Sequence, residues 1–361
     1  MIKSDFSNNI ITISNSILKY YGVEPLHETN KYLDEILSKK GPSRKICLLL
    51  LDGYGTYIQE NFKDETPLIY KNKKFEITSV FPPSTVPSTT GLLSATYPCE
   101  NGYLAWTRKF KEFDTPITVF PSTYVGGDVV CSPRVEELLP CKDIFTMINE
   151  KGKYKALEIK GLDHLYHRDV NSFFKAVNKG LKRYDFTYAY WVDPDATLHE
   201  KGTKSPIVGE KLHILDEKID KLAKENKDVT FVILADHGHI DAKYYDIEDY
   251  PDVLELLTNP YLGLEPRCPC FYVSKENKEI LYNKLKDYFG QHFDVFYKEE
   301  VLQHQLFGKG KFHPSFEEGI GDILMVSNDE WCLAQKTNYK LVSAHSGGTK
   351  DEMYINVAIL N

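Results

Sequence analysis

Three stretches of the chain are almost entirely apolar, and each is followed at once by an aspartate. They cover residues 45–51, 186–192 and 229–235. Runs of this length without alternation are typical of strands buried on both faces, as in a parallel sheet that helices cover. Between the second and third runs, apolar residues recur at helical spacing over 205–226. The pattern therefore predicts an α/β fold with a doubly wound, mostly parallel sheet and helices on both faces.

The stretch 240–330 has a different character from the rest of the chain. It is richer in aromatic residues, is broken by prolines and is less regular, with one helical pattern at 275–289. We interpret it as a smaller inserted cap that covers the ligand site. The remaining residues, 1–239 and 331–361, are then expected to form the catalytic core. The aromatic residues of the cap either provide stacking faces for a base or form a small core of their own.

Carboxylates at the ends of the three apolar runs mark the expected site. In open α/β sheets, ligands bind at the carboxyl ends of the strands, which lie along one edge. Asp52, Asp195 and Asp236 each come at or just after the end of a run. Three strands that bring carboxylates to one edge predict a polar site that holds a metal ion.

Histidines accompany two of these aspartates. His199 follows Asp195 by four residues, so both side chains reach one face of a helical turn. His237 directly follows Asp236 where the chain turns, and His345 lies in a loop of small residues. Imidazole nitrogen and carboxylate oxygen are both good zinc ligands. Taken one at a time, these residues also fit a helix cap with an incidental histidine, or an ordinary polar loop.

A threonine provides a candidate nucleophile. A proline-rich segment runs into a short helix-like stretch at Thr85. The start of a helix presents free N–H groups and the positive end of its dipole to an anion. A hydroxyl group there becomes a nucleophile when a metal ion lowers its pKa. The alternative is an ordinary helix N-cap, a position that threonine also favours.

Composition narrows the class of protein. The net charge is -8, from 44 Lys and Arg against 52 Asp and Glu, with no basic run, so duplex nucleic acid is not an expected partner. The longest apolar run is far shorter than the roughly 20 residues that span a bilayer, and the N-terminal segment is polar. Seven cysteines without a disulfide-framework spacing favour a reducing compartment. We therefore expect a cytoplasmic protein of undetermined oligomeric state that binds a small molecule and no membrane.

Together, these blocks resemble the alkaline phosphatase superfamily, and within it the type I phosphodiesterase/nucleotide pyrophosphatase branch. The resemblance follows chain order and covers most of the chain. It rests on Asp52-Gly53, Thr85-Val86-Pro87 with Ala95-Thr96-Tyr97-Pro98, Pro194-Asp195 with His199, Ala235-Asp236-His237-Gly238, and His345. It implies an alkaline phosphatase-like fold and hydrolysis of a phosphoric ester.

The resemblance also implies a site with two zinc ions, in which manganese is a possible substitute. One ion would be held by Asp195, His199 and His345. The other would be held by Asp52, Asp236 and His237, with the Thr85 oxygen as its fourth ligand. In the implied mechanism, Thr85 attacks phosphorus, and the resulting phospho-threonine is then hydrolysed. The histidines that match no block are expected to be structural or surface residues: His164, His167, His213, His239, His292, His304 and His313.

One departure from the family pattern concerns the substrate. Relatives that act on nucleotide diesters or phosphonoacetate carry an asparagine shortly after the nucleophile block, where this chain has Trp106. The indole of Trp106 either contacts the substrate, through its N–H or its stacking face, or packs beneath the cap. The leading expectation is hydrolysis of a nucleotide-like phosphodiester. The alternatives are a phosphonate hydrolase of the phosphonoacetate type, a phosphomonoesterase assisted by the nearby Arg108, and an inactive binding or regulatory protein.

Overall fold

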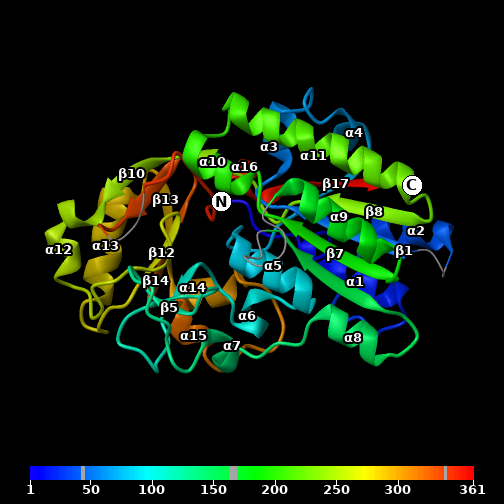
Figure 1. Cartoon of the computed structure of the whole chain (residues 1–361). Helices are drawn as coiled ribbons and strands as arrows, with labels where there is room; N and C mark the ends of the chain where they lie inside the picture. The colour runs from blue at the N-terminus through cyan, green and yellow to red at the C-terminus, as the bar shows by residue number, and fades with distance from the viewer. Residues whose placement is uncertain (42–44, 162–168, 337–339) are drawn as a thin grey trace.

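A mostly parallel sheet of six strands forms the centre of the molecule (Figure 1). The computed structural model describes residues 1–41, 45–161, 169–336 and 340–361. The strand order is β2 (Lys73–Thr78), β17 (Tyr354–Leu360), β8 (Val229–Leu234), β1 (Lys45–Leu51), β7 (Phe186–Trp191) and β6 (Ala156–Lys160). Strands β8, β1, β7 and β6 are parallel, whereas β17 runs antiparallel to both of its neighbours. The predicted α/β class and mostly parallel sheet are confirmed.

The three apolar runs form the adjacent strands β8, β1 and β7. Every residue of β8 is buried, as are those of β1 after its first lysine. Leu50 of β1 pairs with Leu234 on one side and with Tyr190 on the other, so the three strands end at nearly the same level. This register brings the residues that follow each strand to a common edge, as the sequence predicted.

Helices cover both faces of the central sheet (Figure 1). One layer contains α1 (Ile10–Tyr20), α5 (Thr85–Ser94) and α8 (Ile144–Glu150), which contact one another. The other contains α4 (Pro67–Lys71), α9 (Val170–Leu181) and α11 (Pro206–Glu225), with α11 packed against both of the others. The buried apolar residues of α11 recur at helical spacing, because a single face of this helix packs on the protein. The arrangement is the doubly wound one that was predicted.

A second sheet lies beside the central one, to its left in Figure 1. Its strand order is β13 (Phe293–Tyr297), β14 (Ile323–Ser327), β12 (Cys268–Phe271), β11 (Gly263–Glu265), β3 (Thr107–Arg108), β4 (Ile117–Thr118) and β5 (Thr123–Tyr124). Helix α13 (Lys278–Phe289) contacts β13 and matches the helical pattern at 275–289. Strands β3 to β5 precede the stretch 240–330, so the sheet joins two separate parts of the chain. The division into a core and an inserted cap stays a prediction.

Shorter elements connect these layers. The helices are α2 (Lys31–Lys40), α3 (Thr56–Asn61), α6 (Pro98–Asn101), α7 (Val135–Leu138), α10 (Asp195–Lys201), α12 (Pro251–Leu254), α14 (Lys298–Gln303), α15 (Phe316–Gly319) and α16 (Lys350–Met353), with a 3-10 turn at Ile247–Asp249. Two further strand pairs are β10 (Lys243–Asp246) with β15 (Trp331–Ala334), and β9 (Ile240–Asp241) with β16 (Ser343–Ala344). None of the helices in the described ranges is long and apolar enough to cross a membrane. The seven cysteines are all unpaired.

A buried ion pair fastens the second sheet to the loop that carries His345. Arg267, between β11 and β12, and Glu352, in α16, are both fully buried. Arg267 Nε donates to Glu352 Oε1 at 2.6 Å, and Nη2 donates to Oε2 at 2.8 Å. Glu352 also accepts hydrogen bonds from Gly347 N at 2.7 Å and from Thr349 Oγ1 at 2.6 Å. The pair therefore fixes the turn that follows His345.

Candidate metal centre and nucleophile

The aspartates at the ends of β1 and β8 each use one carboxylate oxygen to hold the side chain in place. Tyr190 Oη donates to Asp52 Oδ2. The backbone N–H groups of Gly53 and His237 both donate to Asp236 Oδ1 at 3.1 Å. The other two oxygens, Asp52 Oδ1 and Asp236 Oδ2, are buried and accept no hydrogen bond from any described residue. Buried carboxylate oxygens are costly unless a donor or a cation lies against them, so this pair fits a metal site.

His237 directs a nitrogen lone pair at both of these bare oxygens. Its Nδ1 lies 3.1 Å from the carbonyl oxygen of Gly238, and because a carbonyl only accepts, Nδ1 carries the proton. Nε2 is therefore unprotonated in the neutral ring. It lies 3.4 Å from Asp52 Oδ1 and 3.5 Å from Asp236 Oδ2. Two carboxylates and an imidazole that converge in this way fit a divalent cation such as zinc.

A second group of candidate ligands lies beside the first. Helix α10 places Asp195 and His199 one turn apart, and Asp195 N donates to the carbonyl of Asp52 at 3.0 Å. Asp195 Oδ1 lies 2.6 Å from His239 Nε2, 3.3 Å from His199 Nε2 and 3.7 Å from His345 Nε2. One ligand atom from each of these four residues lies within 4.8 Å of the others. The structure thus brings the six predicted ligand side chains together in two groups.

Burial and mutual repulsion make the charged forms of Asp52, Asp236 and His345 costly. Burial, followed by the charges of Asp236 and Asp195, raises the pKa of Asp52 well above its usual value. Burial also raises the pKa of Asp236, against the opposing effect of His237. The pKa of His345 is held well below its usual value by burial and by His237. A divalent cation stabilises carboxylates and neutral imidazoles together, so it suits all of these groups.

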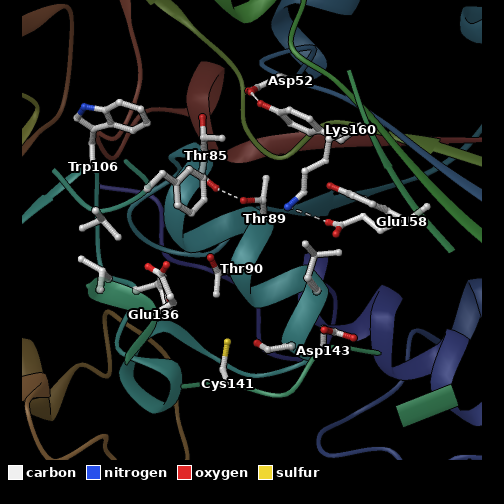
Figure 2. A pocket seen from close by; sticks show the side chains of 18 of the residues that line it. Asp52, Thr85, Thr89, Thr90, Trp106, Glu136, Cys141, Asp143, Glu158 and Lys160 are labelled. Carbon is white, nitrogen blue, oxygen red and sulfur yellow. Dashed lines mark hydrogen bonds and ion pairs between the residues drawn. The ribbon is translucent and has the colours of Figure 1, made fainter. Parts of the chain in front are cut away.

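The hydroxyl group of Thr85 lies at the first group of ligands. Thr85 is the first residue of α5, and its Oγ1 is 3.2 Å from His237 Nε2. The N-cap is Ser84, whose hydroxyl donates to Glu265 Oε1 at 2.6 Å, so Thr85 is not the cap that the alternative interpretation required. Thr85 and Asp52 both line one pocket, and Figure 2 shows them on the same side of it. A hydroxyl group in this position is available as a metal ligand and as a nucleophile.

A pocket of about 810 Å³ opens beside these groups (Figure 2). Asp52 and Thr85 lie toward one end of it, and Cys141 lies toward the other. Trp106 and Phe120 also line the pocket, with ring centroids 6.3 Å apart. Their exposed fractions are 45% and 43%, so a ligand can reach both rings. Trp106 therefore lies on the wall of this pocket, and its contact with a substrate stays a prediction.

Arg108 is not one of the residues that line this pocket. It is fully buried, and its guanidinium group donates to the carbonyl oxygens of Gly102 and Ser315. Among the described residues that line the pocket, the cations are Lys160 and Arg134, and each pairs with a glutamate two positions away. Arg108 thus supports the chain around the second sheet and is not placed to neutralise a phosphate group.

Three residues that shape the site were not predicted. Tyr190 lies inside an apolar run, where its hydroxyl group gives no separate signal. Glu265 comes from β11 and accepts from the backbone N–H of Trp106 at 2.8 Å, a contact that no local pattern reveals. His239 was grouped with the structural or surface histidines, although its place two residues after His237 was a usable signal. Two members of that group lie outside the described residues: His164 and His167.

Comparisons with known proteins bear on the family and the fold of this chain. A family model described as type I phosphodiesterase / nucleotide pyrophosphatase matches residues 142–351. The chain is also similar to the solved structure of murine ectonucleotide pyrophosphatase/phosphodiesterase 5, at 16% identity and a TM-score of 0.66, over 87% of this chain and 88% of that one. An inactive threonine-to-alanine variant of the murine protein, in complex with AMP, matches at the same identity and TM-score, over 87% of each chain.

A bacterial enzyme has a similar structure. Phosphonoacetate hydrolase from Sinorhizobium meliloti 1021, in complex with phosphonoformate, is 16% identical, with a TM-score of 0.64 over 88% of this chain and 90% of that one. At this level of identity, the solved structures support the fold alone. The family model, in contrast, spans more than half of the chain. This protein therefore belongs to the type I phosphodiesterase/nucleotide pyrophosphatase family of phosphoester hydrolases.

Proposed function

We propose that this protein hydrolyses a phosphodiester, with Thr85 as the nucleophile and two zinc ions as cofactors, for which manganese is a possible substitute. One observation carries the proposal. The Thr85 hydroxyl group and two bare carboxylate oxygens converge on Nε2 of His237, at 3.2, 3.4 and 3.5 Å. A merely structural cluster would pair such buried oxygens with hydrogen-bond donors.

The donor sets suit two ions. Asp52, Asp236 and His237, together with the Thr85 oxygen, would hold the first. Asp195, His199 and His345 would hold the second. When bound, two such ions lower the pKa of a hydroxyl nucleophile and neutralise charge on the phosphoryl oxygens.

In the proposed reaction, the oxygen of Thr85 loses its proton to solvent and attacks phosphorus. The bond from phosphorus to the leaving oxygen breaks, and the leaving group takes a proton from water. Thr85 then carries the phosphoryl group as a phospho-threonine that is still esterified to the group that did not leave. A water molecule attacks this phosphorus, releases a phosphoric monoester and returns the proton to the oxygen of Thr85. The carbonyl oxygen of Thr85 accepts from Thr89 Oγ1 at 2.6 Å, which helps to fix the backbone that carries the nucleophile.

The charges of the pocket favour a diester over a monoester. A phosphate monoester carries close to two negative charges at neutral pH and needs more cationic groups than a diester does. Arg108, the candidate for that role, donates to backbone carbonyls elsewhere. Lys160 and Arg134 line the pocket, but their positive charges are offset by Glu158 and Glu136.

An exposed aromatic pair favours a nucleotide-like substrate. Trp106 and Phe120 line the pocket with accessible rings, and a nucleobase stacks on such a surface. Glu265 holds the backbone N–H of Trp106 and so fixes the segment that carries the indole. The complex of the murine relative with AMP gives further support for a nucleotide group. We propose that Trp106 stacks on the base of the substrate.

The test combines metal analysis with three substrates in a single preparation. Bis-p-nitrophenyl phosphate, p-nitrophenyl phosphate and phosphonoacetate represent a diester, a monoester and a phosphonate. We expect about two zinc ions per chain and faster hydrolysis of the diester than of the other two. The variant Thr85→Ala should keep its zinc and lose nearly all turnover, whereas Thr85→Ser should keep part of it, because serine retains a hydroxyl group.

Other outcomes would redirect the proposal. Robust turnover by Thr85→Ala would remove Thr85 from the role of nucleophile. Faster release of phosphate from phosphonoacetate would favour a phosphonate hydrolase, a function that the similar fold of phosphonoacetate hydrolase makes the second candidate. A preparation that takes up zinc but hydrolyses no ester would favour an inactive binding protein.

A further inference from the structure

One carboxylate oxygen of Glu265 contacts two separate segments of the site. Glu265 is the last residue of β11, in the second sheet. Its Oε1 accepts a hydrogen bond from the hydroxyl group of Ser84 at 2.6 Å and another from the backbone N–H of Trp106 at 2.8 Å. Ser84 immediately precedes Thr85, and both Thr85 and Trp106 line the pocket (Figure 2). A single atom therefore joins the backbone next to the candidate nucleophile to the wall of the pocket.

The hydroxyl group of Ser84 contacts Glu265 instead of capping its own helix. Ser84 occupies the N-cap position of α5, where a serine hydroxyl ordinarily accepts a hydrogen bond from an N–H group of the first turn. The side chain of Ser84 makes no such bond and donates to Glu265. The contact therefore ties the residue before Thr85 to the second sheet. It also keeps the Ser84 hydroxyl away from the N–H groups at the start of α5, which suit an anion.

The position of the Trp106 indole depends on the backbone that carries it. Trp106 is 45% exposed, so packing alone restrains its ring weakly. Its N–H donates to Glu265, and its carbonyl oxygen accepts from Val119 N at 2.8 Å. Val119 precedes Phe120, so Trp106 and Phe120, the aromatic wall of the pocket, are linked through their backbones. Loss of the contact with Glu265 should therefore let this aromatic wall move relative to Thr85.

The backbone beside Glu265 is strained. Leu264 has a φ of 67°, in the left-handed region, which is costly for leucine because its Cβ approaches a carbonyl oxygen. Leu264 pairs with Thr107 across β11 and β3, and its carbonyl oxygen accepts from Thr107 Oγ1 at 2.6 Å. Strain of this kind persists only where neighbouring contacts impose it, and it is concentrated at functional sites. It therefore supports a role for Glu265 beyond the packing of the second sheet.

We infer that Glu265 is a positioning residue, which holds the nucleophile Thr85 and the aromatic wall at Trp106 in one fixed arrangement. The inference deepens the proposed function and rests on it. The contact with Ser84 places Thr85 for attack on any phosphodiester, whereas the contact with Trp106 matters only for a substrate that carries a base. A misplacement of about 1 Å can lower turnover by about 100-fold, so both contacts have measurable consequences.

The test compares kcat and KM for two esters, a nucleotide p-nitrophenyl ester and bis-p-nitrophenyl phosphate, which has no base. Glu265→Ala removes both contacts. We expect its kcat to fall by about 10- to 100-fold on both esters. Its KM should rise for the nucleotide ester alone, and by less than in Trp106→Ala, because the indole is displaced but still present. Elemental analysis and circular dichroism report whether the variant keeps its zinc and its fold.

Two variants separate the two contacts. Ser84→Ala removes only the first, so kcat should fall on both esters while the KM for the nucleotide ester stays unchanged. The double variant Glu265→Ala/Trp106→Ala should have the same KM for the nucleotide ester as Trp106→Ala alone, because this contact acts through the indole.

A conservative variant and a surface variant complete the set. Glu265→Gln retains a side-chain oxygen that can accept from both donors, so it should keep most of the turnover that Glu265→Ala loses. Glu35→Ala, on the surface of α2 with 66% of its side chain exposed, is the matched control and should leave kcat and KM unchanged.

Several results would overturn the inference. Wild-type kcat and KM in Glu265→Ala would do so, as would an equal rise in KM for the two esters or a fall in kcat that parallels a loss of zinc. A loss in Glu265→Gln as large as in Glu265→Ala would show that the charge matters and the accepted hydrogen bonds do not. These results reject the inference alone. Failure of the zinc-loaded wild-type protein to hydrolyse either ester would instead reject the proposed function, and the inference with it.

Discussion

Removing the charge of Arg267 should destabilise the whole fold and loosen the loop behind His345. In Arg267→Met, the carboxylate of Glu352 stays fully buried without its cation. Loss of one partner from a buried ion pair costs about 3–5 kcal/mol. Gly347 N and Thr349 Oγ1 still donate to Glu352, which favours the lower end of that range.

Two further hydrogen bonds that Arg267→Met removes add to the expected loss of stability. Arg267 also donates to the carbonyl oxygens of Trp331 at 3.2 Å and Asp329 at 2.6 Å. A buried carbonyl that loses its donor costs about 1 kcal/mol or more, unless water reaches it. We therefore expect Arg267→Met to lower the free energy of unfolding by about 4 kcal/mol. Urea denaturation followed by circular dichroism measures the change as a shift of the midpoint at constant slope.

A double-mutant cycle isolates the ion pair itself. Glu352→Gln removes the negative charge, while its one amide oxygen can still accept from Gly347 N and its NH2 group can donate to Thr349 Oγ1. Because the double variant leaves no unpaired charge, its loss of stability should be at least about 2 kcal/mol smaller than the sum of the single losses. Additivity within about 0.5 kcal/mol would refute the reasoning, since it would mean that the two side chains do not interact.

The ion pair between Arg267 and Glu352 predicts that the stability of the fold depends on pH. Burial raises the pKa of Glu352, but the charge and hydrogen bonds of Arg267 outweigh it, so the pKa is lowered overall. A carboxyl group of this kind contributes stability above its unfolded-state pKa of about 4.3 and loses that contribution as the pH falls through the lower folded-state value. As the pH falls below about 5, the wild-type protein should therefore lose more of its free energy of unfolding than the double variant does.

Three further predictions concern the site. Tyr190→Phe removes the hydrogen-bond donor to Asp52 Oδ2 and should weaken metal binding, measured by chelator competition, by about 10- to 100-fold. An unchanged affinity would mean that the hydroxyl group is dispensable. Gly238→Ala would put a Cβ 2.0 Å from the carbonyl oxygen of Asp351, so the turn between His237 and His239 must move. Elemental analysis should then find less zinc in the variant, and full zinc content would contradict this account. Trp106→Ala should raise the KM for a nucleotide p-nitrophenyl ester by roughly 5- to 150-fold, because it loses about 1–3 kcal/mol of stacking. The KM for bis-p-nitrophenyl phosphate, which has no base, should change little. Equal effects on the two substrates would exclude base stacking.

The central sheet was predictable because its signal is local. An apolar run such as 229–235 is both the strand and the reason for its burial, and the carboxylate that ends it marks the edge of the sheet. Parallel register then places Asp52 and Asp236 together without further information. The fold class and the family followed from these few blocks.

The second sheet and the residues that it contributes to the site could not be predicted from local sequence patterns. Strands β3, β4 and β5 are two residues long each, too short for any periodicity, and are strands only because neighbours pair with them. Glu265 reaches Trp106 across such a pairing, between residues far apart in the chain. Contacts of this kind depend on tertiary structure, so no pattern within one segment reports them.

The candidate ligands and Thr85 come from five segments spread between Asp52 and His345. During synthesis, no single segment carries a complete ligand set, so metal affinity arises only once distant parts of the chain have met. An ion that binds the native chain and not the unfolded one pulls the equilibrium toward the native chain by mass action. Metal supply would then govern how long each newly made molecule survives proteolysis, in addition to how fast it works.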